Sequence, residues 1–255
     1  MQPSERYELI LQQLSRQEMV TIPELMQTFD VSIETVRRDL NFLEKEKKIK
    51  KVYGGAILFN RTASITGGTL RLTENVLEKE AIGRECAAMI HEGDTLYLGP
   101  GTTVLQVAKL LKGRKNLTII TDSMYTAMEF MDTEVELYFI GGKINTRDAH
   151  TAMRIPENAW KDFHAAKAIV GAGGISSEYG ITDYSFSEAY GIRQMLEQSL
   201  QVFVVADNSK FGLVHSYATC ALDRVDRIIT GSAQKADILR DFAPYRHRFL
   251  FAESK

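Results

Sequence analysis

The chain of 255 residues has few of the features that mark secreted or membrane-spanning proteins. It contains only two cysteines, Cys86 and Cys220, whereas a secreted disulfide framework needs more of them. Its apolar runs, such as residues 202–206, are far shorter than the ~20 residues that a membrane-spanning helix requires. Residues 1–6 are polar and lack the apolar stretch of a signal peptide. We therefore expect a soluble, cytoplasmic protein without a membrane partner.

A strong net charge is also absent. The 31 lysines and arginines nearly balance the 33 aspartates and glutamates, and the formal net charge is −2. This balance excludes a uniformly basic nucleic-acid coat but leaves room for a local basic patch. Residues 37–51 hold seven basic and three acidic side chains, so this segment alone carries a charge of +4.

Metal-binding and hydrolase motifs are missing as well. The five histidines show no metal-ligand spacing, and no Gly-x-Ser-x-Gly nucleophile motif is present. A glycine-rich run at residues 171–176 does not complete the dinucleotide fingerprint, because Ser176 stands where its third glycine belongs. We expect no metal, no cofactor and no catalytic residue, and we discount the alternative of a redox-sensing NAD-binding regulator.

The first 59 residues have the pattern of short helices followed by a hairpin. Apolar residues at helical spacing predict helices at about 4–16, 21–30 and 33–47, with Ser4 and Ser32 as N-caps. Thr21 and Glu24 have the spacing of a capping box. Gly54-Gly55 joins two extended runs, 49–53 and 56–59, and suits a tight hairpin.

Two helices joined by a short turn, the second one polar and basic, have the geometry of a helix-turn-helix. Arginine can read guanine and asparagine can read adenine, while hydroxyl groups more often fix phosphates. Asp39 is interpreted as a residue that orients an arginine or caps a neighbour. The alternative is a three-helix packing unit with a solvated charge run. The predicted DNA-binding residues are Ser32, Thr35, Arg37, Arg38, Asn41, Lys50, Lys51 and Tyr53.

The residues after the hairpin have a different organisation. Residues 60–74 are polar and are predicted to be a linker, and residues 75–255 are predicted to form a second domain. Strand-like and helix-length segments alternate there, which predicts a parallel sheet with crossover helices. The predicted strands are 95–98, 117–121, 135–140, 167–171, 201–206, 226–230 and 246–251, and the predicted helices are 78–90, 103–111, 123–131, 156–163, 187–200 and 233–242.

A glycine-rich turn follows the first predicted strand of this domain. Gly101, Thr102 and Thr103 stand where a strand gives way to a helix, and backbone N–H groups at such a helix start can cradle a phosphate. The alternative is a plain turn that Thr102 or Thr103 caps. Several other predicted strands also end in small or polar residues, and ligands of open parallel sheets bind at the carboxyl ends of strands.

The motifs together resemble a known family. Residues 31–40 (VSIETVRRDL) and 52–56 (VYGGA) resemble the DeoR-type family of bacterial sugar-metabolism regulators. The second domain resembles the effector domain of that family, which is similar to ribose-5-phosphate isomerase. The positions that match its motifs are Lys79, Gly101, Thr102, Thr103, Gly141, Gly142, Glu188, Asp207 and Lys210. One position departs, because Asp122 replaces the family asparagine; an acid there would repel a second anionic group or prefer a hydroxyl donor.

The resemblance implies an α/β fold with an N-terminal winged helix-turn-helix and a parallel-sheet sensor domain. It implies that the Gly101 loop holds a phosphate, with Lys79, Lys143 and Lys210 as candidate counter-charges, although Lys143 fits better as a solvated amine. Asp122, Glu188 and Asp207 would meet sugar hydroxyls; Asp207 alternatively serves a strand-end turn.

The function that follows is a transcriptional regulator, expected to be a repressor of a carbohydrate-utilisation operon. Its implied partners are operator DNA, a phosphorylated sugar and further copies of itself in a dimer or tetramer. The alternative is a sugar-phosphate isomerase or deaminase with an added DNA module, in which the carboxylates supply general acid and base.

Overall fold

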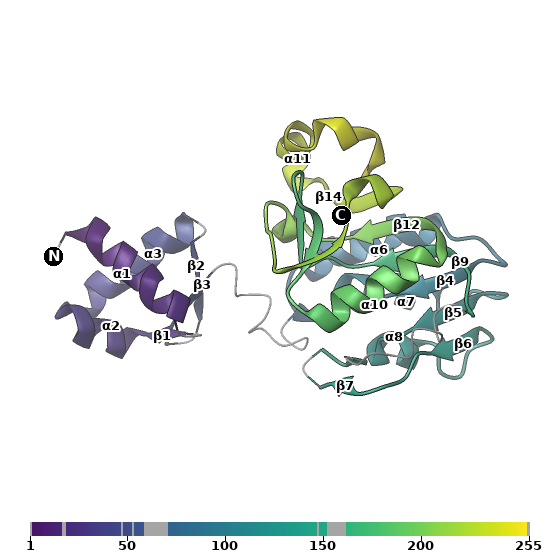
Figure 1. The fold of residues 1–255 in the computed structure, drawn as a ribbon, viewed down its shortest axis with the longest axis horizontal. Helices are drawn as coiled ribbons and strands as arrows, with labels where there is room; N and C mark the ends of the chain where they lie inside the picture. The colour runs from purple at the N-terminus through teal and green to yellow at the C-terminus, as the bar shows by residue number, and fades with distance from the viewer. Residues whose placement is uncertain are drawn as a thin grey trace. The chain divides into compact units, whose positions relative to one another are not determined.

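A computed structural model describes residues 2–16, 19–46, 48–52, 54–58, 71–146, 148–151 and 162–253 (Figure 1). The chain divides into two compact units, residues 1–66 and 67–255. Tyr53, most of the predicted linker and all but the last two residues of the helix predicted at 156–163 lie outside the described residues.

The N-terminal unit consists of three helices and a small antiparallel sheet. Its elements are α1 (Pro3–Arg16), β1 (Val20–Thr21), α2 (Ile22–Phe29), α3 (Ile33–Lys45), β2 (Ile49–Val52) and β3 (Gly55–Leu58). The strand order is β1-β3-β2, so the predicted hairpin also pairs with the extended link before α2. The capping box is confirmed, since the Glu24 N–H donates to the Thr21 hydroxyl and the Glu24 carboxylate accepts from the Thr21 N–H. Ser4 was expected to be an N-cap, but the helix already begins at Pro3, whose fixed φ suits the first turn.

A buried ion pair joins two helices of this unit. The Arg6 guanidinium on α1 donates to both carboxylate oxygens of Asp39 on α3, with Nη2 2.9 Å from Oδ1. Both side chains are buried beside apolar residues such as Ile10 and Leu40. Asp39 therefore orients an arginine as expected, and that arginine is Arg6.

The C-terminal unit is built on a seven-stranded parallel sheet in the order β15-β14-β12-β9-β4-β5-β6, which confirms the predicted class. Its strands are β4 (Thr95–Leu98), β5 (Thr118–Thr121), β6 (Glu136–Phe139), β9 (Ala165–Val170), β12 (Ser199–Val205), β14 (Arg227–Gly231) and β15 (Phe249–Ala252). The last strand starts later than predicted because residues 243–248 form a 3-10 helix.

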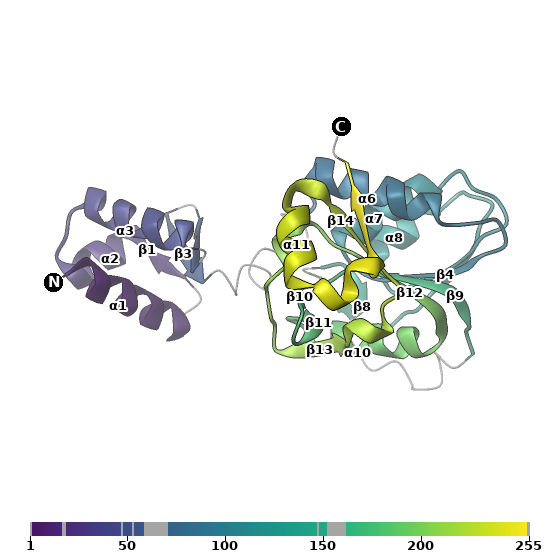
Figure 2. The same ribbon diagram turned by 90° about the horizontal axis from the view of Figure 1, so that it is seen from above.

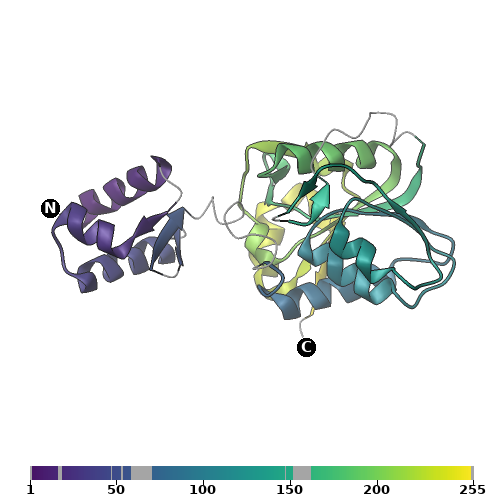
Figure 3. The same ribbon diagram turned by 90° about the horizontal axis from the view of Figure 1, so that it is seen from below.

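Helices cover both faces of this sheet. The helices are α6 (Val76–Ala88), α7 (Thr102–Leu111), α8 (Met124–Glu129), α10 (Phe186–Glu197) and α11 (Lys235–Asp241). Figures 2 and 3 show α6, α7 and α8 on one side and α10 on the other. Successive residues of β4 alternate between the two cores: Leu96 and Leu98 pack toward α6 and α7, and Tyr97 packs toward α10. Because both faces are covered, the central strands are almost continuously apolar.

A second, antiparallel sheet was not predicted. It consists of β10 (Gly174–Ser176), β11 (Gly180–Asp183) and β13 (Tyr217–Cys220), in that order, and a hairpin of β7 (Ile144–Asn145) and β8 (His150–Thr151) lies elsewhere in the unit. These strands are short, and β11 pairs with a strand more than 30 residues away. Gly180 has a φ of 71°, and a Cβ there would lie 2.5 Å from the Cys220 carbonyl oxygen, so this turn requires glycine.

Candidate functional site

The turn between α2 and α3 has the local chemistry of a helix-turn-helix. Asp30 ends α2 in the left-handed conformation with a φ of 50°, which reverses the chain direction within a few residues. The Ser32 hydroxyl then caps α3 by accepting a hydrogen bond from the Thr35 N–H at 3.3 Å. The start of α3 is thus fixed relative to α2 by two adjacent local features.

One face of α3 is polar and exposed. Ser32, Arg37, Arg38 and Asn41 are exposed and Thr35 is half-buried, while the apolar residues Val36, Leu40 and Leu43 face the core. The predicted base-reading and phosphate-binding residues therefore share the solvent side of the helix that a helix-turn-helix inserts into the major groove.

The hairpin is tied to this helix through Lys51. The Lys51 ammonium donates to Asn41 Oδ1 at 2.5 Å and lies 3.2 Å from Glu44 Oε2. Its backbone N–H also donates to Glu44 Oε1. The hairpin of β2 and β3 is the predicted wing. Together with α3 it presents Asn41 and Lys51 as one polar surface, next to the half-buried Lys50. DNA that engages Asn41 would compete with this intramolecular contact.

A pocket lies at the carboxyl ends of β4, β9 and β12, the three central strands of the parallel sheet. Seven of the ten residues predicted to bind the effector line its wall: Lys79, Gly101, Thr102, Thr103, Glu188, Asp207 and Lys210. They come from α6, from the loop after β4, from α10 and from the turn after β12. Residues far apart in the sequence thus meet where a ligand of an open parallel sheet is expected.

The Gly101 loop leaves a helix N-terminus open to the pocket. Gly101, with a φ of 128°, is the N-cap of α7, and because it has no side chain it makes no capping hydrogen bond to the first turn. The alternative in which Thr102 or Thr103 caps the helix is therefore wrong, since both lie inside it. The free N–H groups and the positive end of the helix dipole can receive an anion.

Two lysines and one aspartate lie beside this loop. Lys79 is only 3% exposed, and burial lowers the pKa of its ammonium. Its Nζ donates to the carbonyl oxygens of Arg71 and Glu74, at 2.7 Å each. Burial acts to raise the pKa of Asp207, but Lys210, the Ser209 hydrogen bonds and Lys79 together hold that pKa below its ordinary value.

The alternative role predicted for Asp207, in a turn at the end of a strand, is also seen in the structure. Its Oδ1 accepts from the Ser209 N–H at 3.0 Å and from Asn75 Nδ2 at 3.1 Å. Asp207 thus organises the turn after β12 while its charge stays in the pocket.

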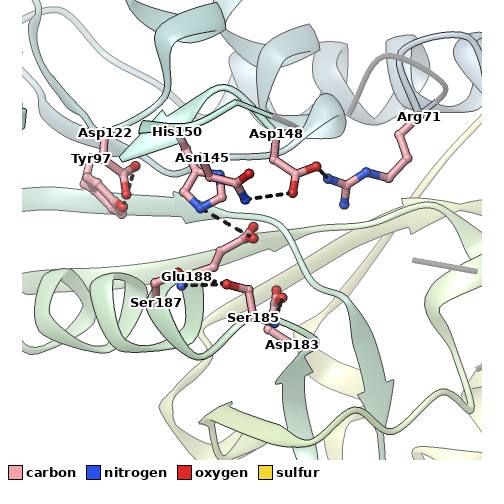
Figure 4. A network of polar contacts seen from close by, with 10 residues as sticks. All are labelled: Arg71, Tyr97, Asp122, Asn145, Asp148, His150, Asp183, Ser185, Ser187 and Glu188. Carbon is pink, nitrogen blue, oxygen red and sulfur yellow. Dashed lines mark hydrogen bonds and ion pairs between the residues drawn. The ribbon is translucent and has the colours of Figure 1, made fainter. Parts of the chain in front are cut away.

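Another part of the pocket is acidic. Glu188 in the first turn of α10 is 7% exposed, and burial raises its pKa to about 7. Asp183 at the end of β11 is 3% exposed, and burial together with the nearby Glu188 raises its pKa well above the ordinary value. Figure 4 shows Glu188 facing His150, whose Nε2 lies 3.9 Å from Glu188 Oε2, with Arg71 paired to Asp148 close by.

The remaining three predicted residues lie outside the pocket wall. Asp122 follows β5 and is buried, where it accepts a hydrogen bond from the Tyr97 hydroxyl at 3.1 Å and where burial raises its pKa to about 6. Gly141 and Gly142 are exposed and follow the edge strand β6. The pocket opens over the centre of the sheet, so residues that follow its outer strands do not reach the wall.

The pocket also contains residues that sequence reasoning missed. The sequence pattern assigns Arg71 to the linker, and Asn75, Asp183 and Tyr184 belong to none of the predicted motifs. Asp183 ends β11 and Tyr184 follows it, so recognising this short strand would have predicted both residues at a strand end. No pattern in the sequence marks Arg71.

Two further findings concern the described residues only. None of their helices is long and apolar enough to cross a membrane. They contain no group of three or more histidine, cysteine, aspartate or glutamate side chains that could hold a metal ion.

Comparisons with known proteins agree with this architecture. Residues 6–62 match the DeoR-like helix-turn-helix domain, and residues 74–232 match the DeoR C-terminal sensor domain. The chain is 31% identical to the transcriptional regulator GolR of Listeria innocua, over 94% of this chain and 95% of that protein. It is 35% identical to the transcriptional repressor GlcR of Bacillus subtilis, over 90% and 89% of the two chains.

A third relative is the glycerol-3-phosphate regulon repressor of Escherichia coli, 29% identical over 94% of this chain and 95% of that one. Among solved structures, ribose 5-phosphate isomerase A of Methanocaldococcus jannaschii matches 55% of each chain at 16% identity and a TM-score of 0.41. The family matches span both units and describe a regulator, not an enzyme. The chain therefore belongs to the DeoR family of transcriptional regulators, with a helix-turn-helix domain followed by a sensor domain.

Proposed function

We propose that this protein represses a carbohydrate-utilisation operon in the cytoplasm and that a phosphorylated sugar, bound in the pocket at the strand ends, controls its affinity for operator DNA. The observation that carries the proposal is the pocket itself, where an uncapped helix N-terminus and the buried ammonium of Lys79 lie beside polar groups that suit hydroxyls. Relatives support the carbohydrate link, since one is the repressor of a glycerol-3-phosphate regulon.

The phosphate end of the ligand would lie at the Gly101 loop. The N–H groups of the first turn of α7 donate to phosphate oxygens, and Lys79 and Lys210 supply positive charge. The hydroxyls would meet Glu188 and Asp207. This arrangement uses seven of the predicted residues and leaves Asp122, Gly141 and Gly142 outside the pocket.

The operator would bind to the exposed face of α3 and to the wing. We assign base reading to Arg38 and Asn41, and backbone contacts to Lys50, Lys51 and Tyr53. Because a helix-turn-helix regulator usually recognises two half-sites, the protein is proposed to act as a dimer or tetramer. Ligand binding alters operator affinity only if the DNA-competent and DNA-released states bind the sugar phosphate with different affinities.

Fluorescence anisotropy with DNA from upstream of the protein's own gene tests this function. The full chain is titrated at one fixed salt concentration, with and without a panel of phosphorylated sugars. One compound is expected to shift the binding curve, and Thr102→Ala is expected to weaken that shift without changing ligand-free operator affinity. Operator binding that no compound alters would contradict the phosphate site, and loss of operator binding by Thr102→Ala would show that the loop is structural.

A further inference from the structure

One part of the pocket wall holds buried polar atoms without hydrogen-bond partners in the described part of the chain. They are Arg71 Nε, the phenolic oxygen of Tyr184 and Glu188 Oε2, the last of which faces His150 Nε2 at 3.9 Å, beyond hydrogen-bond distance. A buried polar group without a hydrogen bond destabilises the folded state, and native proteins keep few of them. Three such atoms in the wall of one pocket indicate groups that a bound molecule satisfies.

The chemistry of these atoms matches neighbouring hydroxyl groups. Arg71 Nε is a donor only, the Tyr184 hydroxyl both donates and accepts, and Glu188 accepts as a carboxylate and donates as an acid. A sugar hydroxyl also donates and accepts. The surrounding acids Asp148 and Asp183 disfavour a second anionic group, so this part of the pocket fits the uncharged polyol end of a monophosphate.

Arg71 is held in place by groups that leave its Nε unused. Its Nη2 forms an ion pair with Asp148 Oδ1, and Asn145 Nδ2 donates to the other oxygen of Asp148 at 3.1 Å (Figure 4). Its guanidinium carbon lies 5.2 Å from the centroid of the Tyr184 ring. The side chain is 17% exposed, so the guanidinium is fixed before a ligand arrives.

The backbone around Arg71 is connected to the phosphate end of the pocket. Lys79 Nζ holds the carbonyl oxygens of Arg71 and Glu74, and Asn75 Nδ2 donates to Asp207. A phosphate bound near Lys79 would compete with these two carbonyl oxygens for hydrogen bonds from the Lys79 ammonium. Residues 71–75 therefore contact both ends of the pocket, and the chain runs from residue 71 back through residues 67–70 to the DNA-binding unit.

We propose that Arg71 reads the polyol end of the ligand and couples occupancy of the pocket to the DNA-binding unit. The inference rests on the proposed function and adds the residue by which the pocket distinguishes a sugar phosphate from inorganic phosphate. A sugar phosphate satisfies Arg71 Nε and changes the arrangement of residues 71–75, whereas inorganic phosphate occupies the Gly101 loop without contacting Arg71.

Two variants of the full-length protein test the coupling. Arg71→Met removes the guanidinium, and Arg71→Lys keeps a charge for Asp148 but lacks the Nε donor. Arg240→Met is the matched control, because Arg240 is an exposed arginine on α11 that also pairs with aspartates. Calorimetry measures the binding of inorganic phosphate, glycerol 3-phosphate and hexose 6-phosphates, and anisotropy measures operator binding with each compound at saturation.

The wild type and Arg240→Met are expected to bind one polyol phosphate at least about tenfold more tightly than inorganic phosphate, the value of one good charged hydrogen bond. Both Arg71 variants are expected to lose this preference and the operator response, while phosphate affinity and ligand-free operator affinity stay unchanged.

Other outcomes separate the two proposals. An operator response in both Arg71 variants equal to that of the wild type overturns the role of Arg71. Joint loss of phosphate binding and thermal stability in both variants overturns it too, since the residue would then be structural. A wild-type protein that binds polyol phosphates no better than inorganic phosphate overturns the polyol subsite. If no phosphate compound binds the wild type, the proposed function itself fails.

Discussion

The charged residues of the two candidate sites lie in opposite environments. In the DNA-binding unit, Arg37 and Arg38 are exposed on α3, whereas in the sensor unit Lys79, Glu188 and Asp207 are all less than a tenth exposed. Exposed charges contribute little to stability and are screened by salt, while buried charges depend strongly on their partners. Substitutions on the DNA-binding face should therefore alter binding alone, and substitutions in the pocket should alter both binding and folding.

The Arg6–Asp39 pair is the exception in the N-terminal unit and gives the largest expected effect. Asp39→Ala leaves the buried guanidinium of Arg6 without its partner, so this unit is expected to lose about 3–5 kcal/mol of stability. Chemical denaturation followed by circular dichroism measures the loss. Glu34→Ala is the control, because Glu34 lies exposed on the same helix. Equal stability of both variants would show that the pair contributes no more than a surface charge.

Glu188 tests how a buried charged group of the sensor unit affects its stability. Burial raises its pKa from 4.5 to about 7, so the native state binds this proton more tightly than the unfolded chain does. The unfolding free energy of the sensor unit should therefore fall as the pH rises from about 4.5 to about 7. The decrease is at most about 1.4 kcal/mol for each unit by which folding raises the pKa.

Glu188→Gln removes the titrating group and should flatten this pH dependence. The measurement is denaturant unfolding at pH 5 and pH 8 on both proteins. Because Glu188 also helps to raise the pKa of Asp183, the difference between the proteins reports Glu188 together with its effect on Asp183. A variant whose stability falls with pH as steeply as that of the wild type would assign the dependence to other carboxyls.

Arg38 tests the expectation that an exposed charge of the DNA-binding unit affects binding but not stability. Arg38→Ala should weaken operator binding by about 1–3 kcal/mol if the guanidinium reads a base, without a change in melting temperature. Anisotropy on operator and on scrambled DNA separates base reading from phosphate contact. An equal loss on both sequences would mean that Arg38 contacts only the backbone.

The smallest effect is expected at the capping box. Thr21→Ala removes the hydroxyl that accepts from the Glu24 N–H and should destabilise α2 by about 1 kcal/mol. Thermal unfolding measures this change, and Thr21→Ser should restore most of the loss because it keeps the oxygen. Destabilisation by Thr21→Ser as large as by Thr21→Ala would indicate that the methyl group matters instead.

Much of the fold could be predicted because its determinants are local. The capping box, the hairpin at Gly54-Gly55 and the alternation of apolar strands with helices each depend on residues close in sequence. The antiparallel sheet of β10, β11 and β13 could not be predicted in this way. Its strands have three or four residues, and its register is fixed by pairing of Ile181 with Cys220.

The residues of the candidate site also divide into those that a local sequence pattern predicts and those that it does not. Gly101, Thr102 and Thr103 form a contiguous strand-turn-helix motif, so their place in the pocket follows from one local pattern. Arg71 precedes α6 and Tyr184 follows β11, so only the tertiary fold brings them to the same pocket wall. Gly141 matched a family motif equally well but follows an edge strand, which the one-dimensional pattern does not reveal.

The sequence by itself determined the two units, the helix-turn-helix, the parallel sheet and the strand-turn-helix loop at Gly101, because helix caps, glycine turns and apolar periodicity act over a few residues. Only the tertiary structure decided which ionisable groups are buried together, that Asp39 pairs with Arg6 and that Arg71 enters the pocket. The physical reason is that desolvation and charge pairing depend on distances in space between residues that the sequence holds far apart.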